Sequence, residues 1–151
     1  MGEMKQVYDE VRSLWVRASP EEIVRQSWLQ KMIKELDYPK HLLAVEKELS
    51  TLQHLLPLKQ SMPCRRIDIL CFGKSTRHPQ EVFPLILIEC KAESLSELDL
   101  EQALAYNTHV QAYFVAIVNQ HTIWLRYNTD KDQYVRDCLP SYHELIESTY
   151  G

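Results

Sequence analysis

The chain has 151 residues, 45% of them hydrophobic and 25% charged, which is the size and balance of one globular domain over residues 1–151. Three glycines, no Pro-rich or Ser-rich stretch and no long apolar run exclude a flexible linker and a membrane span, and without a signal peptide we expect a cytoplasmic protein. The net charge of −4 disfavours a chain that binds nucleic acid over its whole surface.

The first predicted element is a helix over residues 20–36. Ser19 stands at the N-cap position, Pro20 in the first turn and Glu22 at the third helical position, which is the spacing of a capping box. Apolar residues then recur at helical intervals until a proline ends the pattern. Residues 42–49 follow, and their composition predicts a strand that becomes polar at its end.

Two further strands carry the residues of chemical interest. Residues 66–72 alternate polar residues with isoleucines, which predicts a strand in which Asp68 faces away from the isoleucines. Residues 82–88 are almost all apolar, as in a central strand covered on both faces, and they lead directly into Glu89 and, two residues later, Lys91. Because side chains alternate along a strand, Glu89 and Lys91 are expected to share one face.

The remaining elements complete an α/β pattern. A second helix is predicted to begin at a cap on Ser94 or Ser96 and to continue to about Val110. Strands over residues 113–118 and 122–127 follow, and a short helix ends the chain. This order of elements predicts an α/β domain with a mixed central β-sheet flanked by helices.

Charge is segregated along the chain. Residues 59–78 contain five lysines and arginines against Asp68 alone, whereas four acidic residues cluster between positions 93 and 101. Such segregation permits a basic face that could meet DNA despite the negative total. Arg65 and Arg66 fit either contacts with backbone phosphates or a solvated entrance to a strand.

Asp68, Glu89 and Lys91 form a candidate catalytic set. Hydrolysis of a phosphodiester needs neutralised charge on the phosphate and an activated water, and a divalent cation held by carboxylates provides both. A lysine on the same face can orient that water or stabilise the growing charge. The spacing alone is not specific, because Glu3-Met4-Lys5 repeats it near the N-terminus, and an exposed ion pair between Glu89 and Lys91 is the structural alternative.

Five short motifs occur in a fixed order along the chain. They are Pro20-Glu21-Glu22 with Arg25-Gln26, Val45-Glu46, Arg66-Ile67-Asp68-Ile69, Ile88-Glu89-Cys90-Lys91, and Gln102 followed four residues later by Tyr106. Together they resemble the PD-(D/E)xK nuclease superfamily, most closely the N-terminal nuclease domain of type I restriction enzyme restriction subunits, over residues 20–128. The last motif resembles that of RecB-like nucleases. The resemblance implies a restriction-endonuclease-like fold, although Ile67 stands where the family usually has proline.

The resemblance also implies roles for individual residues. Asp68 and Glu89 would bind Mg²⁺ or Mn²⁺, with Glu46 as a plausible accessory ligand, and Lys91 would be catalytic. Gln102 and Tyr106, which share one helical face, would support the metal or the DNA. One further carboxylate, Glu22, could approach the same site, but its capping-box position accounts for it without a function.

Two functions therefore remain open at this stage. The first is a metal-dependent endonuclease or exonuclease that hydrolyses phosphodiester bonds in DNA, with a separate motor or specificity subunit and a homodimer as possible arrangements. The second is a catalytically inactive nuclease-like module that binds nucleic acid or a protein partner, because these 151 residues contain no Walker loop for a motor. A third interpretation reduces the acidic and basic residues to a surface ion pair in an unrelated α/β fold.

Other features of the sequence carry less information. Gly73-Lys74-Ser75 resembles the end of a phosphate-binding loop, but Asp68 replaces the first glycine of that motif, so a turn at a strand exit is predicted. The four cysteines lack C-x-x-C spacing, which predicts reduced and mostly buried thiols. The six histidines are scattered, and the three tryptophans are predicted to be core or interface residues.

Overall fold

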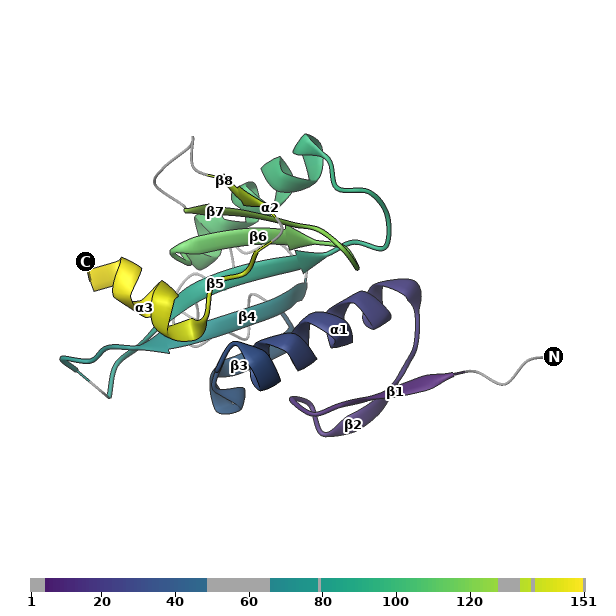
Figure 1. Ribbon diagram of the computed structural model, residues 1–151, viewed down its shortest axis with the longest axis horizontal. Helices are drawn as coiled ribbons and strands as arrows, with labels where there is room; N and C mark the ends of the chain where they lie inside the picture. The colour runs from purple at the N-terminus through teal and green to yellow at the C-terminus, as the bar shows by residue number, and fades with distance from the viewer. Residues whose placement is uncertain (1–4, 49–65, 79, 128–133, 137, 151) are drawn as a thin grey trace.

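A mixed β-sheet forms the centre of the molecule (Figure 1). The structure is a computed structural model that describes residues 5–48, 66–78, 80–127, 134–136 and 138–150. The six strands of this sheet lie in chain order, and all neighbours are antiparallel except the parallel pair β5 and β6. The strands are β3 (Leu43–Glu48), β4 (Arg66–Lys74), β5 (Val82–Cys90), β6 (Phe114–Val118), β7 (Ile123–Tyr127) and β8 (Tyr134–Arg136).

Helices cover both faces of the sheet (Figure 1). Helix α1 (Pro20–Glu35) and helix α3 (Tyr142–Tyr150) contribute to the larger hydrophobic cluster, and helix α2 (Glu97–Val110) packs in two smaller clusters. Strand β5 lies between these layers, and its last six residues are all buried. The predicted α/β fold class is therefore confirmed, and the element order is consistent with a restriction-endonuclease-like fold.

Most predicted boundaries agree with the structure to within one or two residues. Helix α1 ends at Glu35, before the 3-10 turn η1 (Lys40–Leu42) that leads into β3. Ser96, rather than Ser94, caps α2: its hydroxyl accepts the Asp99 N–H, and the Asp99 carboxylate accepts the Ser96 N–H. Such reciprocal bonds satisfy two donors that a helix start otherwise leaves unpaired.

A short N-terminal hairpin was not predicted. Strands β1 (Gln6–Asp9) and β2 (Leu14–Arg17) form a separate two-stranded sheet beneath α1 (Figure 1). The Asp9 carboxylate holds its turn by accepting the N–H groups of Val11 and Arg12, and Ser13 adopts a left-handed backbone with φ 55°. An aspartate whose side chain accepts the N–H two residues ahead can form a turn by itself. The sequence therefore lacks the Asn-Gly or Asp-Gly pair from which a hairpin is usually predicted.

Gly73 corrects another prediction. It lies inside β4, paired with Phe83 of β5, rather than in a turn at the strand exit. A Cβ atom at this position would come within 2.8 Å of the Ile146 Cδ1 atom and of the Phe83 ring. Any larger residue would force the Ile146 and Phe83 side chains to shift, because α3 packs directly against the strand.

The predicted basic face is not assembled by β4. Arg66 begins the strand and Lys74 ends it, so their backbones are about 26 Å apart along an extended strand. Lys59, Cys64 and Arg65 lie outside the described residues. None of the helices in the described ranges has the length and hydrophobicity that a bilayer crossing demands.

Candidate functional site

Asp68 lies where β4 and β5 stop pairing. Their backbone register ends at Ile69 opposite Ile88, and one step further the Asp68 Oδ2 atom accepts the Cys90 N–H at 2.8 Å. A side chain thus replaces the next backbone bond of the ladder. Simple alternation also fails here: Ile69 packs in the cluster that includes α1, whereas Ile67 packs in a cluster with α2. The prediction that Asp68 faces away from both isoleucines was wrong for this reason.

The carboxyl groups of Asp68 and Glu89 meet at this end of the sheet. Burial raises the pKa of Asp68, but hydrogen bonds from the Glu89 side chain, the Cys90 N–H and Arg25 outweigh burial and hold the pKa below its ordinary value. The influence of the Glu89 side chain on the Asp68 pKa indicates that the two carboxyl groups lie close together. Glu89 is itself 5% exposed, so the pair is largely shielded from water.

Arg25 of α1 neutralises the Asp68 carboxylate from the helix side. One terminal nitrogen, Nη2, lies 2.6 Å from Asp68 Oδ1 and 3.2 Å from Glu46 Oε1, and Nη1 lies 2.8 Å from Glu22 Oε1. Burial lowers the pKa of Arg25, but its bond to Asp68 and the nearby carboxylates raise it above the ordinary value. The guanidinium therefore stays charged although it is 4% exposed.

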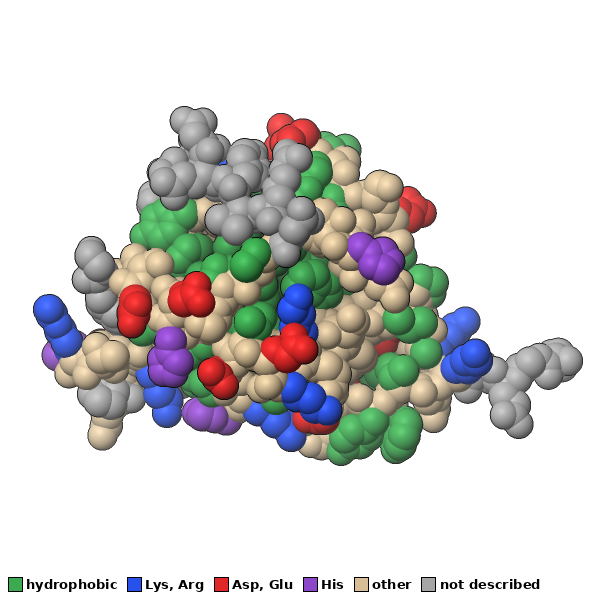
Figure 2. All heavy atoms as spheres, in the orientation of Figure 1, with side chains coloured by type: hydrophobic (Ala, Val, Ile, Leu, Met, Phe, Trp, Pro, Cys, Tyr) green, Lys and Arg blue, Asp and Glu red, His purple; other side chains and the backbone are tan. Residues whose placement is uncertain are grey.

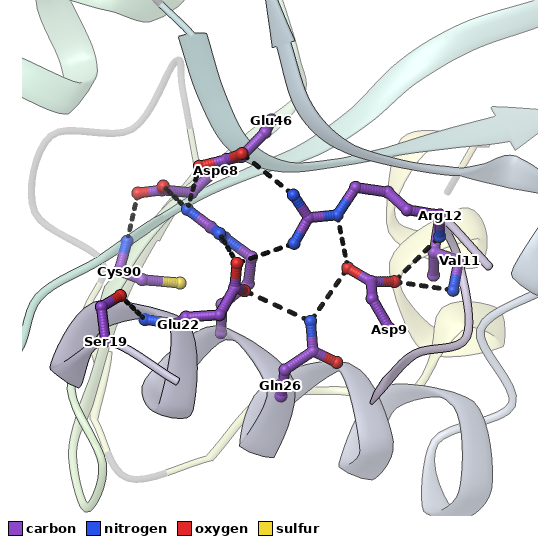
Figure 3. A network of polar contacts seen from close by, with 10 residues as sticks. Asp9, Val11, Arg12, Ser19, Glu22, Gln26, Glu46, Asp68 and Cys90 are labelled. Carbon is purple, nitrogen blue, oxygen red and sulfur yellow. Dashed lines mark hydrogen bonds and ion pairs between the residues drawn. The ribbon is translucent and has the colours of Figure 1, made fainter. Parts of the chain in front are cut away.

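Arg12 reaches the same carboxylates from the turn of the hairpin (Figure 3). Each of its three guanidinium nitrogens contacts a different side chain: Nε lies 2.6 Å from Asp9, Nη2 lies 2.7 Å from Glu22 and Nη1 lies 2.9 Å from Glu46. A planar guanidinium with several fixed donors suits such shared binding. Arg12 thus joins the hairpin to both α1 and β3.

Glu22 does more than cap α1. Ser19 accepts the Glu22 N–H at 3.2 Å, as predicted, but the Glu22 carboxylate does not complete the capping box. It binds Arg12 and Arg25 instead, and it accepts a bond from Gln26 at 3.3 Å (Figure 3). The explanation of Glu22 by capping alone was therefore incomplete.

Glu46 reaches the cluster through an unusual backbone. Its φ of 52° lies in the left-handed region, inside strand β3. Val45 packs in the core beside α1, and the left-handed residue lets the next carboxylate turn to Arg12 and Arg25 of the same layer. A non-glycine residue held this way costs about 1–3 kcal/mol and is typical of functional sites.

The whole cluster has more acidic than basic groups. Five carboxyl groups gather around two guanidinium groups, an excess of three acids, and their oxygens are the donors that Mg²⁺ and Mn²⁺ prefer. The carboxylates of Asp68 and Glu46 both contact the positively charged Nη2 atom of Arg25, so they converge on one point. Within the described ranges, no three His, Cys, Asp or Glu side chains are arranged as a ready-made metal site.

Lys91 lies beside the carboxyl pair but faces α2. Its Nζ atom is 3.7 Å from the Asp99 Oδ1 atom, and its side chain is 31% exposed. An ion pair between Glu89 and Lys91 was the predicted alternative to catalysis; the ion pair found for Lys91 is with Asp99 of the α2 cap. A long, partly exposed pair of this kind contributes little to stability, so Lys91 can exchange partners at small cost.

Gln102 and Tyr106 differ in their surroundings. Gln102 is exposed in α2, whereas Tyr106 is 7% exposed and packs with Ile67 and Leu87. Ile67 precedes Asp68 in β4, and Leu87 comes two residues before Glu89 in β5. Tyr106 therefore lies under the strands that carry the carboxyl pair, while Gln102 points to solvent.

Cys71 and Cys90 are buried, as predicted, whereas Cys138 is exposed. Burial raises the pKa of both buried thiols, so they stay protonated near neutral pH and are poor metal ligands. Cys90 contributes to the site through its backbone N–H only.

Sequence patterns did not point to Asp9 and Arg12, and they gave Arg25 no role beyond its place in a motif. Asp9 is fully buried, accepts Gln26 at 2.9 Å and binds Arg12. A usable signal was the D-x-x-R spacing at Asp9 and Arg12, which suits a turn closed by an ion pair, followed by a second arginine three residues after Glu22.

Comparison with known proteins gives one match. The family described as type I restriction enzyme R protein N terminus (HSDR_N) matches residues 20–138. No curated protein and no solved structure matches the chain. The family match begins at α1 and includes Glu46, Asp68, Glu89 and Lys91, but it leaves out the β1–β2 hairpin. The chain therefore belongs to the family of type I restriction enzyme R protein N-terminal domains.

Proposed function

We propose that this domain is a divalent-metal-dependent nuclease of the PD-(D/E)xK type that hydrolyses phosphodiester bonds in DNA. The observation that carries the proposal is the meeting of the Asp68 and Glu89 carboxyl groups at the open end of β4 and β5, with Lys91 two residues further on. Membership of a restriction-enzyme family supports the same reading of the site.

Asp68 and Glu89 would hold Mg²⁺ or Mn²⁺, and Glu46 is the best-placed further carboxylate because it shares Arg25 with Asp68. When bound, the cation supplies charge neutralisation at the phosphate and an acidified water. Both carboxyl groups must be ionised to act as ligands. Glu22 binds the other terminal nitrogen of Arg25 and so helps to keep this arginine in place.

Lys91 would act on the phosphate or on the attacking water. Its ammonium is partly exposed and its contact with Asp99 is long, so it can turn from the α2 cap to a bound phosphate. Tyr106 supports the strands from below rather than contacting solvent. Gln102, which is exposed on the same helix, is free to reach DNA that lies across the site.

The family description also suggests partners. It names a type I restriction enzyme R protein, so we propose DNA as the substrate and other subunits, such as a motor or a specificity subunit, as the assembly in which this domain works. A homodimer would place two such sites on the two strands of a duplex.

The decisive experiment compares purified wild-type protein with Lys91→Ala and Asp68→Asn on single-stranded and duplex DNA, with Mg²⁺ or Mn²⁺. We expect Lys91→Ala to lower the cleavage rate at least about a hundredfold with an unchanged circular dichroism spectrum. Lys31→Ala, which removes an exposed lysine from α1, is the matched control and should cleave normally. Equal cleavage by wild type and Lys91→Ala would contradict the proposal.

A second candidate function is an inactive nuclease-like module that binds nucleic acid or protein. The observation in its favour is the 2.6 Å contact between Arg25 and Asp68, which already neutralises a proposed ligand. Calorimetric titration with Mn²⁺ separates the two: heat that disappears in Asp68→Asn supports the nuclease. DNA binding without any metal-dependent heat supports the inactive module.

A further inference from the structure

The β1–β2 hairpin presents one exposed face. In its register Gln6 lies opposite Arg17 and Tyr8 lies opposite Trp15, so these four side chains project from the same side of the ribbon. All four are exposed, whereas Asp9, on the other face, is buried toward α1 and binds Gln26. The hairpin therefore packs against α1 through Asp9, whose cross-strand partner Leu14 is 44% exposed, and leaves the opposite face to solvent.

Tyr8 and Trp15 form an aromatic pair on this exposed face. Their ring centroids are 5.4 Å apart with an interplanar angle of 67°, an edge-to-face contact that leaves a ring surface open. Trp15 is 63% exposed and Tyr8 is 43% exposed. Figure 2 shows hydrophobic side chains gathered over the hairpin, at the lower right, with Lys and Arg side chains close by.

The hairpin holds a fixed position relative to the proposed nuclease site. Arg12, in the turn, binds Glu22 of α1 and Glu46 of β3, and Trp15 follows Arg12 by three residues. A ribbon anchored by several partly buried ion pairs cannot swing freely away from those carboxylates. A polymer that extends from the site can therefore meet the aromatic pair at a constant distance.

We propose that this face binds an unpaired segment of a nucleic-acid strand, with one base stacked on Trp15 and a backbone phosphate paired with Arg17. Stacking on an aromatic ring beside a cation is how sequence-tolerant binding of single strands is achieved. The four side chains include no carboxylate, and the nearby Glu10 turns away to Gln30 of α1. The choice of a nucleic acid as the ligand rests on the proposed function.

Charge favours this ligand over an apolar protein surface. Arg17 and the adjacent exposed Lys5 flank the rings with positive charge, and Gln6 adds a polar group on the same face. A protein-docking patch would be expected to have a continuous apolar centre with a polar rim. Here polar and aromatic side chains share four positions, as in a strand-binding surface.

Anisotropy titration with a fluorescent single strand of about 20 nucleotides, in EDTA so that no cleavage occurs, tests the proposal. We expect Trp15→Ala to weaken binding about tenfold or more, and Arg17→Gln to weaken it and reduce the salt slope by about one phosphate. Tyr113→Ala is the matched control, because Tyr113 is also exposed, at 39%, and lies edge-to-face with Phe83 at 5.5 Å. It should bind as wild type does.

Unchanged affinity in both Trp15→Ala and Arg17→Gln would overturn the inference. The inference would also be overturned if Trp15→Ala changed the mass of the protein in analytical ultracentrifugation and left its DNA affinity unchanged. The exposed face would then be an interface between copies of the chain. Asp68→Asn separates this inference from the proposed function: it should lose cleavage and keep binding. If Asp68→Asn cleaves normally while Trp15→Ala binds the single strand weakly, the nucleic-acid surface on the hairpin is supported and the proposed nuclease site is contradicted.

Discussion

Replacement of Arg25 by methionine is the sharpest test of how the acidic cluster is held. The substitution keeps an unbranched side chain, close to the aliphatic stem of arginine, and a good helix-forming residue, so α1 itself should persist. It removes the charge that binds Asp68 at 2.6 Å and Glu22 at 2.8 Å. Both carboxylates would then lie close together with no cation from α1.

The expected loss of stability follows from burial. Removing one partner of a buried ion pair costs about 3–5 kcal/mol, because the other charge stays buried and unpaired. Asp68, with a side chain 17% exposed, loses a close positive charge, whereas Glu22 keeps its contact with Arg12 at 2.7 Å and water screens Glu46 at 35%. The Arg25 Nε atom finds no acceptor among the described residues, so its loss recovers about 1 kcal/mol. We therefore expect a loss near the lower limit, about 3 kcal/mol, or about 6–12 °C in Tm.

Urea unfolding followed by circular dichroism measures this quantity, with Lys31→Met as the control. Lys31 is an exposed cation on the same helix, 5.4 Å from the Trp28 ring, and its loss should cost less than about 1 kcal/mol. An Arg25→Met protein within about 1 kcal/mol of wild type would refute the argument that buried charge pairing holds the cluster. Millimolar Mg²⁺ should restore part of the loss, because a divalent cation can bind the same carboxylates.

Three further outcomes follow from the structure. Burial raises the pKa of Asp9, but hydrogen bonds from Arg12 and Gln26 outweigh it and hold this pKa below the ordinary value of 3.8. The stability that Asp9 contributes is therefore complete above pH 3.8 and is lost as the pH falls through the lower pKa of the folded state. Urea unfolding measured between neutral pH and pH 3 should show a smaller loss of stability on acidification in Asp9→Asn than in wild type. Gly73→Ala should lower Tm measurably by calorimetry, because the new Cβ would meet Ile146 and Phe83 at 2.8 Å. Ser96→Ala should cost about 1 kcal/mol in urea unfolding through loss of the α2 cap, and an unchanged midpoint would contradict that role.

The sequence predicted the elements whose signals are local. Ser19 and Pro20 predicted the start of helix α1, and an unbroken apolar run predicted β5, because helix caps and buried strands require particular residue types at those positions. The Asp68 and Glu89 positions followed from those strands. The direction of Asp68 did not, because the ladder between β4 and β5 ends beside it and its side chain replaces a backbone bond.

The hairpin and the arginines required the structure. The hairpin turn depends on the Asp9 side chain and contains no glycine, so it lacks the Asn-Gly or Asp-Gly pair from which a hairpin is usually predicted. Arg12 lies 34 positions before Glu46 in the chain, and no periodic pattern reports a contact of that separation. Trp15 was predicted as a core or interface residue; at 63% exposure it does not belong to the core, and the interface alternative stays a prediction.

The arrangement of charge explains why a site of this kind needs segments outside the central sheet. A divalent cation requires several carboxylates close together, but carboxylates brought together on adjacent strands repel one another and destabilise the fold before any ligand arrives. Arg25 comes from the helix layer and Arg12 from the hairpin, and between them they contact Asp9, Glu22, Glu46 and Asp68. The ion pairs of the two arginines hold the segments together. The acidic groups that remain in excess would attract an added cation. If the cluster binds a metal as we propose, stability and metal affinity would depend on the same charges, and a substitution that frees a carboxylate for metal should also weaken the fold.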